Sequence, residues 1–344
     1  MGSGRQVSMK DVAALAEVSV GTVSNVLNSP GRVSEATTRR VLAAIDSLGW
    51  VPNEGARQLR TGYSRAVGMI VLDIGNPYFA DVARGAEDVL YGHAYSVYIG
   101  NSDQQPEREE RLVRQFEQHR VRGVLLAPIA NVTDSAHRLR RRGIPVVMID
   151  RARDLDSCAV GVDDSEGGRL AATHLIERGH RRLAFVGGPA TLAQVRDRRA
   201  GAELALRTLT DGGTLRTIVT PALATQPGLI AAQEIVALPQ DVRPTGVFAA
   251  NDLLAIGLLQ GFVAAGLRVP EDIALIGYDD IEFAAFSAVP LSSVRQPRQE
   301  MGARAATLLI EEIEALDEGR THVHQVVRMA PVVVPRASTA AGPR

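Results

Sequence analysis

Residues 19–28 predict a short helix that packs with one face and leaves the other free for recognition. Spacings of three and four residues define the two faces, with Val23, Val26 and Leu27 on the apolar side and Gly21, Thr22 and Asn25 on the polar side. Ser19 stands at the N-cap position, where its hydroxyl can accept a hydrogen bond from a backbone N–H of the first turn. We therefore expect a helix that begins just after Ser19.

A second amphipathic helix is predicted directly upstream. Ser8 and Asp11 have the Ser-x-x-Asp spacing of a capping box. The apolar stripe that follows consists of Val12, Leu15 and Ala16. Only Glu17 and Val18 separate the two helices, which leaves room for a tight turn and nothing longer. This arrangement predicts a helix-turn-helix, a motif whose second helix lies in the major groove of DNA.

A third helix completes a small headpiece over residues 8–52. Ser34 is a suitable N-cap, Glu35 complements the helix dipole, and Gly49 ends the pattern. The expected apolar stripe consists of Val41, Leu42, Ile45 and Leu48. Three short helices are about the smallest unit that can bury a core, so the headpiece is expected to be marginally stable alone.

Residues 53–65 predict a hinge, and residues 1–7 a flexible N-terminus. Good helix formers run from Glu54 to Leu59, and Gly62 follows them. An isolated helix this short is unstable in water, so we expect it to fold only against a partner. A plain linker is the alternative, but the helix-turn-helix just before it favours a hinge that becomes ordered on DNA.

From residue 66 onward, apolar runs alternate with helical patterns. The runs expected to form buried parallel strands are 67–74, 95–100, 123–127, 146–149, 159–162, 183–186, 246–250 and 273–276. So many alternations exceed one sheet of ordinary width, which predicts two doubly wound parallel α/β lobes. We expect an N-lobe of about 66–162 and 295–325, a C-lobe of about 163–294 and 326–336, and a disordered tail at 337–344.

Polar side chains follow several predicted strands, where ligands bind in such folds. The motifs are Asn76-Pro-Tyr-Phe79, Asp150-Arg151, Asn251-Asp252, Tyr278-Asp279 and Gln296-Pro297, with Arg198 in a strand-to-helix connection. Each motif alone is ordinary turn chemistry. Together they place carboxylates, amides, a guanidinium and an aromatic ring around one cleft, which suits a polyhydroxylated ligand.

The sequence lacks the motifs of the common enzyme classes. It contains no Gly-x-Gly-x-x-Gly, Gly-x-Ser-x-Gly or His-Glu-x-x-His motif, and its one lysine, Lys10, removes Walker A and Schiff-base chemistry. The single cysteine, Cys158, excludes an internal disulfide and a multi-cysteine metal site. His322 and His324 alternate near a terminal strand and are expected to form a satisfied surface pair. We expect no enzyme activity, no cofactor and no metal.

Charge and hydropathy indicate a cytoplasmic protein with a basic head. Residues 1–65 carry three more basic than acidic side chains, whereas the remainder carries four more acidic than basic ones. A basic head on an acidic body suits contact with phosphates. No apolar run approaches the ~20 residues that span a bilayer, and residues 1–5 lack the apolar stretch of a secretory signal.

With these features, the chain resembles the lactose-repressor (LacI/GalR) family of bacterial transcription regulators from about residue 8 to residue 335. The most specific part is residues 9–28, followed by 33–39 and Trp50-Val-Pro-Asn53. Weaker similarities lie at 172–180, 249–252 and 275–279. The resemblance implies a helix-turn-helix headpiece, a hinge helix and a two-lobed core like that of periplasmic binding proteins.

The resemblance also implies which residues contact DNA. Base-reading positions fall on Val20, Gly21 and Asn25, and positions on or beside the DNA backbone fall on Ser8, Ser19, Thr22, Ser24, Asn28, Arg32, Ser34, Asn53, Arg57 and Arg60. The hinge leucine that is inserted between base pairs falls on Leu59, and Ala56 precedes it where two hinge helices pack together. Asn25 has the geometry to pair with adenine, whereas Gly21 supplies no side-chain donor. We therefore expect a large share of readout from the hinge and from DNA bending.

Within the core, the resemblance extends to bacterial ribose-binding proteins. The positions implied to contact the effector are Asn76, Tyr78, Phe79, Asp150, Arg151, Arg198, Phe248, Asn251, Asp279 and Gln296. This set favours a small sugar, with ribose first, and a purine is the main competitor because the positions of Asp279 and Arg198 can also serve a base.

The sequence thus predicts a homodimeric repressor that binds a palindromic operator and responds to a small ligand between its lobes. A purine-responsive regulator of the same family is one alternative. A sugar-binding protein of a transporter is another, which the headpiece and the missing signal sequence oppose.

Overall fold

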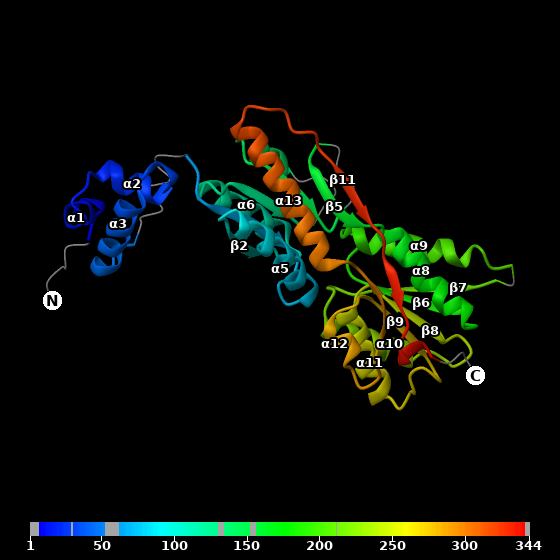
Figure 1. Ribbon diagram of the computed structural model, residues 1–344. Coiled ribbons are helices and arrows are strands. Elements are labelled where there is room, and N and C mark those ends of the chain that lie inside the picture. The colour runs from blue at the N-terminus through cyan, green and yellow to red at the C-terminus, as the bar shows by residue number, and fades with distance from the viewer. Residues whose placement is uncertain are drawn as a thin grey trace. The chain divides into compact units, whose positions relative to one another are not determined.

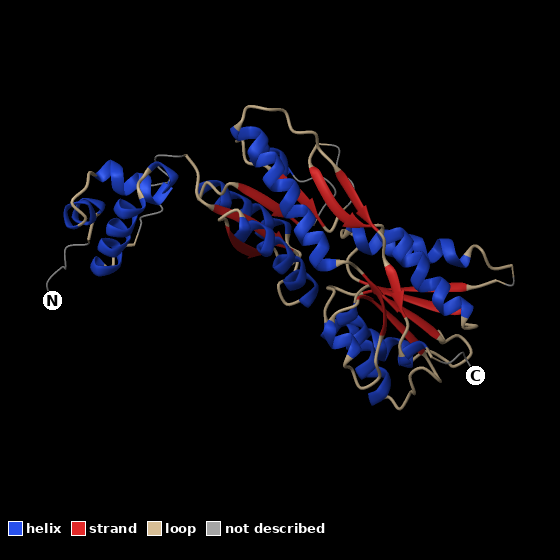
Figure 2. Cartoon of the chain, in the orientation of Figure 1, coloured by secondary structure: helices blue, strands red, loops and turns tan. Residues whose placement is uncertain are grey.

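The computed structural model describes residues 7–28, 30–51, 62–129, 134–151, 156–210 and 212–340. By its internal contacts the chain divides into two compact units, Met1–Ser64 and Arg65–Arg344 (Figure 1). The first is helical and the second contains both helices and strands (Figure 2). Each unit is described by itself below.

The first unit is the predicted headpiece of short helices. Its elements are α1 (Met9–Leu15), α2 (Val20–Asn28), the 3-10 turn η1 (Pro30–Arg32) and α3 (Glu35–Leu48). Its buried apolar side chains are Val12, Ala13, Ala16, Val23, Val26, Val41, Ala44 and Trp50. The prediction was wrong for Leu15 and Leu42, which are 52% and 50% exposed. Ala13 and Ala44 face the core instead, because the packed faces of α1 and α3 are rotated away from those two leucines.

The three predicted N-caps are present in the headpiece. The Asp11 carboxylate accepts the backbone N–H of Ser8 at 2.9 Å, and Ser19 Oγ accepts the N–H of Thr22 at 3.0 Å. Ser34 Oγ accepts the N–H of Thr37 at 3.3 Å. Between α1 and α2, Glu17 adopts a left-handed conformation with φ of 53°, which reverses the chain within the short link. Local sequence therefore fixes both ends of the turn.

The second unit contains the two predicted lobes, each built on a six-stranded sheet (Figures 1 and 2). The first sheet has the order β11-β5-β4-β3-β1-β2 and the second β12-β10-β9-β8-β6-β7. All pairings are parallel except that of β12 with β10. The first sheet consists of β1 (Ala66–Val71), β2 (Ser96–Asn101), β3 (Gly123–Leu126), β4 (Val146–Ile149), β5 (Cys158–Val162) and β11 (Val326–Met329). The second consists of β6 (Arg182–Gly187), β7 (Thr214–Val219), β8 (Gly246–Ala249), β9 (Ala274–Asp279), β10 (Ser292–Arg295) and β12 (Val332–Val334).

Helices accompany both sheets. With the first sheet lie α5 (Pro77–Gly92), α6 (Pro106–Gln118), α7 (Asp134–Arg141) and α13 (Arg298–Asp317). With the second lie α8 (Asp164–Glu177), α9 (Ala193–Leu206), α10 (Thr225–Val236), α11 (Asp252–Ala264), α12 (Glu282–Ala285) and the turn η2 (Ala337–Thr339). No helix within the described ranges combines the length and apolarity needed to cross a membrane.

Two boundary expectations were wrong. Strand β11 pairs in parallel with β5, so the chain stays with the first sheet up to Met329 and does not leave it at residue 325. The expected tail is ordered as far as residue 340, because Ser338 and Thr339 are buried and hydrogen-bonded. Ser338 Oγ donates to the carbonyl of Leu275 at 2.5 Å, and Thr339 Oγ1 lies 2.7 Å from His174 Nε2. The eight predicted strands are all present, and the structure adds β7, β10, β11 and β12. The prediction that all eight are buried was wrong for β2, which is largely exposed because it forms the edge of the first sheet.

Three helix pairs of the second unit approach each other at reciprocal glycines. A Cβ added to Gly85 on α5 would lie 1.9 Å from the carbonyl oxygen of Gln299 on α13, and one added to Gly302 would lie 1.9 Å from that of Val82. The same exchange joins α8 to α9 through Gly168 and Gly201, and α10 to α11 through Gly228 and Gly257. These backbones are in contact, so the glycines fix the separation of each pair.

We expect Gly85→Ala to destabilise the second unit by about 1–3 kcal/mol or more, because the added methyl group must displace a backbone carbonyl. Gly92→Ala on the same helix is the matched control, since nothing lies within 4 Å of its Cβ position. Denaturant unfolding of both variants measures the difference. Equal stability of the two variants would contradict the close-packing argument.

Candidate functional site

A cavity of about 380 Å³, including space open to solvent, lies among residues from both lobes. Its position follows from the fold, because the polar segments after β1, β4 and β8 and at the end of β9 contribute to it. It is lined by Leu72, Asp73, Asn76, Tyr78, Phe79, Gln104, Asp150, Gln194, Arg198, Leu223, Asn251 and Asp279.

Seven of the ten side chains predicted for the effector site meet at this cavity. They are Asn76, Tyr78, Phe79, Asp150, Arg198, Asn251 and Asp279. Gln296 is buried and bonds to Asp279 and Tyr78. Arg151 is not among the lining residues. Phe248 is also absent, because it is 1% exposed and its ring packs in the core against Phe185 and Tyr278.

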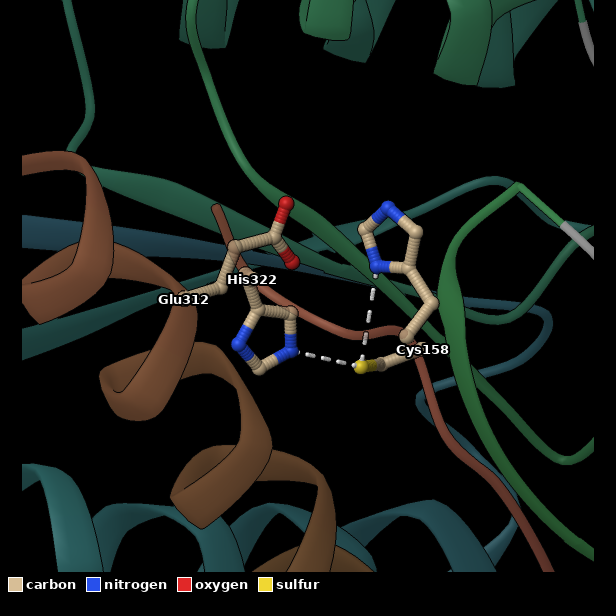
Figure 3. Close-up of side chains that lie close together, drawn as sticks. Cys158, Glu312 and His322 are labelled. Atoms are coloured by element: carbon tan, nitrogen blue, oxygen red, sulfur yellow. Dashed lines mark hydrogen bonds between the residues drawn. The ribbon is translucent and has the colours of Figure 1, made fainter. Parts of the chain in front are cut away.

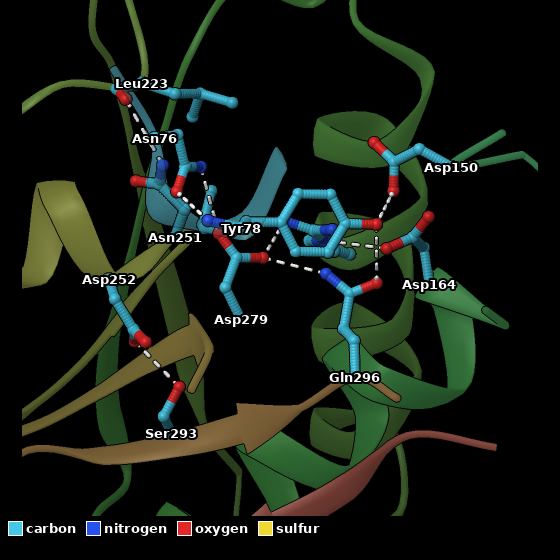
Figure 4. Close-up of polar contacts among 12 residues, drawn as sticks. Asn76, Tyr78, Asp150, Asp164, Leu223, Asn251, Asp252, Asp279, Ser293 and Gln296 are labelled. Atoms are coloured by element: carbon cyan, nitrogen blue, oxygen red, sulfur yellow. Dashed lines mark hydrogen bonds and ion pairs between the residues drawn. The ribbon is translucent and has the colours of Figure 1, made fainter. Parts of the chain in front are cut away.

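A hydrogen-bond network across the cavity joins the two lobes (Figure 4). Tyr78 donates its hydroxyl to Asp150 Oδ1 at 2.7 Å. On the other lobe, Asp279 accepts from Asn76 Nδ2 at 3.3 Å and from Gln296 Nε2 at 2.8 Å. Tyr78 and Asp150 both belong to the first lobe, whereas the bond between Asn76 and Asp279 crosses to the second, so a ligand that takes over Asn76 or Asp279 changes the contacts between the lobes.

The amides of Asn76 and Asn251 also build the helices on which they stand. Asn76 caps α5 by accepting the N–H of Tyr78 at 3.0 Å, and Asn251 caps α11 by accepting that of Leu254 at 3.0 Å. Phe79 lies beside Tyr78, with ring centroids 4.9 Å apart in an edge-to-face arrangement. The cap geometry therefore fixes where these residues meet the cavity.

Arg198 is a buried guanidinium that the surrounding structure holds on several sides. Its Nε donates to Asp164 Oδ1 at 2.7 Å and its Nη1 to the carbonyl of Ala250 at 2.7 Å. Its Cζ lies 3.7 Å from the ring centroid of Tyr278, within cation–π range. Although burial opposes the charge, the carboxylates of Asp164 and Asp279 raise the pKa of Arg198. The side chain is therefore a permanent cation in the cleft.

The carboxyl groups of the site outnumber this cation. Burial raises the pKa of Asp150 to about 7, and the negative charge of Asp164 adds to the shift. Burial likewise raises the pKa of Asp279 and of Asp164, in both cases against the opposing effect of Arg198. Carboxylates that burial destabilises gain from hydrogen-bond donors, so the cavity favours hydroxyl or N–H groups over an anionic ligand.

Two of the aspartates that line the cavity, Asp150 and Asp279, have unusual backbone angles. Asp150 follows β4 with φ of 59°, and Asp279 ends β9 with φ of 102°. Residues other than glycine seldom adopt such angles, and they are over-represented at binding sites. Here the unusual angles occur where both carboxylates enter the lining of the cavity.

Several site residues escaped the sequence prediction. Asp164 pairs with Arg198, and its place two residues after the end of β5, at the start of α8, matches the strand-end pattern that identified the others. Gln194 lines the cavity from the first turn of α9, and Leu223 lines it from the connection between β7 and α10, and no sequence pattern distinguished either residue. Arg298, at the start of α13, donates to the carbonyl of Asp280 at 2.6 Å and to Asp81 at 2.8 Å. It thereby links α5 to the chain that follows β9.

In the headpiece, the predicted DNA-contacting face of α2 is accessible. Gly21 and Asn25 are exposed and Val20 is 42% exposed, while Val23 and Val26 are buried. Ser19, Arg32 and Ser34 are exposed, whereas Ser8, Thr22 and Ser24 are half-buried. Asn28 ends α2. The predicted hinge contacts Asn53, Ala56, Arg57, Leu59 and Arg60 lie outside the described residues.

Comparisons with known proteins agree with this division into headpiece and core. Residues 8–53 match the model of bacterial regulatory proteins of the lacI family, and residues 172–339 match a periplasmic binding protein-like domain. The HTH-type transcriptional repressor PurR of Aliivibrio fischeri is 34% identical over 334 residues, which cover 96% of this chain and 98% of the relative. The ribose operon repressor of Escherichia coli is 35% identical over 337 residues, covering 96% of this chain and 99% of the relative.

A solved structure supports the fold of the core. A LacI family transcriptional regulator from Enterococcus faecium with bound ribose is 31% identical, covers 81% of this chain and 99% of its own, and superimposes with a TM-score of 0.69. A helix-turn-helix headpiece followed by a two-lobed core defines a ligand-responsive DNA-binding regulator. The chain belongs to the LacI family of transcription regulators.

The raised pKa of Asp150 predicts a pH dependence of stability. Between about pH 4 and pH 7 the folded protein keeps a proton that the unfolded chain has lost, so the free energy of unfolding falls as pH rises through this window. We expect Asp150→Asn to flatten this fall by up to about 1.4 kcal/mol per pH unit.

Urea unfolding of the full-length chain at a series of pH values measures this effect. Glu234→Gln, which changes an exposed carboxyl on α10, is the control and should keep the wild-type slope. Identical slopes for Asp150→Asn and wild type would show that Asp150 does not hold the proton.

Proposed function

We propose that this chain is a homodimeric, cytoplasmic repressor whose affinity for a palindromic operator is set by a small sugar bound between its lobes, with ribose first. The observation that carries the proposal is the cross-lobe network, in which Asn76 and Gln296 both bond to Asp279 within a cavity lined by both lobes. The similar proteins named as repressors support a regulatory role for this site.

The chemistry of the cavity supports a neutral polyhydroxylated ligand. Asp73, Asp150 and Asp279 line it, and Arg198 is the one cationic side chain among the lining residues that the structure describes. Asp164 already pairs with this guanidinium at 2.7 Å. A phosphorylated sugar would place its dianion among these carboxylates, whereas hydroxyl groups can donate to them. Phe79 offers a ring on which the C–H face of a sugar can rest.

Relatives support both candidate effectors. The ribose operon repressor and the ribose-bound Enterococcus faecium regulator favour a sugar, whereas the PurR relative favours a purine. Phe79 can stack on either ligand. Tyr78, the other ring of the lining, stands edge-to-face to Phe79 and donates its hydroxyl to Asp150, so the two rings do not present parallel faces that would enclose a base. The sugar is therefore the first candidate and the purine the second.

The mechanism follows from the network. A ligand that accepts from Asn76 or Gln296, or donates to Asp279, replaces contacts between the lobes and so alters their relative angle. A change of about 1–3 kcal/mol in operator affinity requires only that the ligand prefers one lobe geometry by that amount. The predicted hinge, residues 53–65, transmits this preference to the headpiece.

The exposed polar face of α2 predicts a specific effect of Asn25→Ala on DNA binding. The loss of a bidentate contact to adenine should weaken binding to the preferred duplex by about 1–3 kcal/mol per half-site, that is, ~5–150-fold. Binding to random duplex of the same length should not change, because phosphate contacts remain. Selection from a randomised duplex pool, followed by titration at fixed salt, measures both. An equal loss on both duplexes would contradict base reading by Asn25.

The cavity predicts ligand selectivity. Ribose, at about 100 times its Kd, should stabilise the protein by ~2.7 kcal/mol, and ribose 5-phosphate should not bind. Phe79→Ala should weaken ribose binding at least tenfold, whereas Phe286→Ala, which removes an 80% exposed ring, should not. Calorimetric titration with ribose, ribose 5-phosphate, hypoxanthine and guanine separates the candidates. If only a purine binds, the purine and not the sugar is the effector.

A further inference from the structure

Four potential metal ligands meet on the first lobe, away from the cavity (Figure 3). Cys158 begins β5, Glu312 lies on α13, and His322 and His324 lie between α13 and β11. One donor atom of each side chain lies within 4.8 Å of all the others. None of the four lines the effector cavity.

The distances around the sulfur approach those of a tetrahedral centre. Cys158 Sγ lies 3.2 Å from His322 Nε2 and 3.9 Å from His324 Nδ1. With bonds of about 2.3 Å to sulfur and 2.0–2.1 Å to nitrogen, a tetrahedral zinc ion needs these atoms about 3.5 Å apart. The four donor atoms lie within 4.8 Å of one another, so a contraction of at most about 1.4 Å across the widest pair brings all four to bonding distance.

Burial makes this cluster different from an ordinary surface group. Cys158 is fully buried and Glu312 is 8% exposed. Within the described part of the chain, Glu312 Oε2 is buried without a hydrogen-bond partner, which is costly for a carboxylate. Figure 3 shows the Glu312 carboxylate beside the His322 imidazole. A cation at this point would satisfy the oxygen.

The backbone also supports a thiolate at Cys158. The N–H of Gln325 donates to Cys158 Sγ at 3.3 Å, and such a contact outside the ligand set stabilises the negative charge of a metal-bound sulfur. Gln325 follows His324 directly, and the next residue, Val326, pairs with Ala159. The register of β11 against β5 therefore fixes both histidines next to the cysteine.

We propose that Cys158, Glu312, His322 and His324 bind a divalent transition metal ion, for which Zn²⁺ is the best match. One thiolate, two imidazoles and one carboxylate form a four-coordinate set typical of zinc. Cys158 binds as the thiolate and its proton is released to solvent. The ion connects β5, α13 and the segment leading to β11, and thereby secures the edge strand of the first sheet.

This site departs from the sequence expectation of a satisfied surface pair of histidines and no metal. The sequence pattern did not indicate this cluster, because its side chains are brought together by the pairing of β11 with β5 and by α13, not by a short spacing in the sequence. The proposal is independent of the effector and of the operator.

Titration of the full-length protein with Zn²⁺ tests the proposal. The protein is purified without a histidine tag and freed of metal with a chelator. Wild type should bind one ion per chain and unfold at a higher temperature with it. His322→Gln and His324→Gln should each lower the affinity at least tenfold, since even contacts outside the ligand set change affinity by ~10–100-fold. The matched control is His93→Gln, which changes an exposed histidine at the end of α5 that is not among the four proposed ligands, and this variant should bind Zn²⁺ as wild type does.

Substitution with Co²⁺ identifies the sulfur ligand. A sulfur-to-cobalt charge-transfer band should appear in wild type and be absent in Cys158→Ser. Because Cys158 is buried, the fold of Cys158→Ser is first compared with that of wild type by circular dichroism. If Cys158→Ser misfolds, the zinc affinities of the two histidine variants still decide the test. Absence of stoichiometric binding in wild type, or unchanged affinity in both histidine variants, would overturn the proposal.

Discussion

The buried guanidinium of Arg198 is the interaction on which the architecture of the cleft depends. A charge taken out of water must be paired, and Arg198 finds Asp164 on α8, the carbonyl of Ala250 after β8 and the ring of Tyr278 on β9. The backbones of α8 and α9 are in contact at this point, because the carbonyl of Arg198 itself occupies the space beside Gly168. This contact fixes the position of Arg198 on α9 relative to Asp164 on α8. Helix packing and site chemistry therefore share the same residues.

From this anchored charge, the polar network extends to the other lobe. Asp279 lies 3.9 Å from Arg198 and accepts from Asn76 and Gln296, while Arg298 joins the chain after β9 to α5. Each contact is individually modest, at about 0.5–3 kcal/mol. Since the contacts of Asn76 with Asp279 and of Arg298 with Asp280 cross between the lobes, a ligand of similar interaction energy is able to redistribute them, and this is the physical basis of the proposed control.

Local interactions explain what was predictable. The caps at Ser19 and Ser34, the turn at Glu17-Val18 and most strand-end side chains of the cavity depend on short spacings and on one property of parallel sheets. The predictions that were wrong concern features that depend on long-range packing. The rotation of the helices that exposes Leu15 and Leu42, the core position of Phe248, and the pairing of β11 with β5 leave no periodic signal in the sequence. The Cys158 cluster belongs to the same group, because its ligands come from three separate segments.

The central claim is that ligand and operator share one conformational equilibrium, so their binding free energies must be linked in both directions. Calorimetric titration of ribose into the full-length protein, with and without a saturating preferred duplex, measures this linkage directly. The account predicts that the duplex changes the ribose Kd by about 5–150-fold, and that ribose changes the duplex Kd by the same factor. Identical ribose affinities with and without the duplex would contradict it.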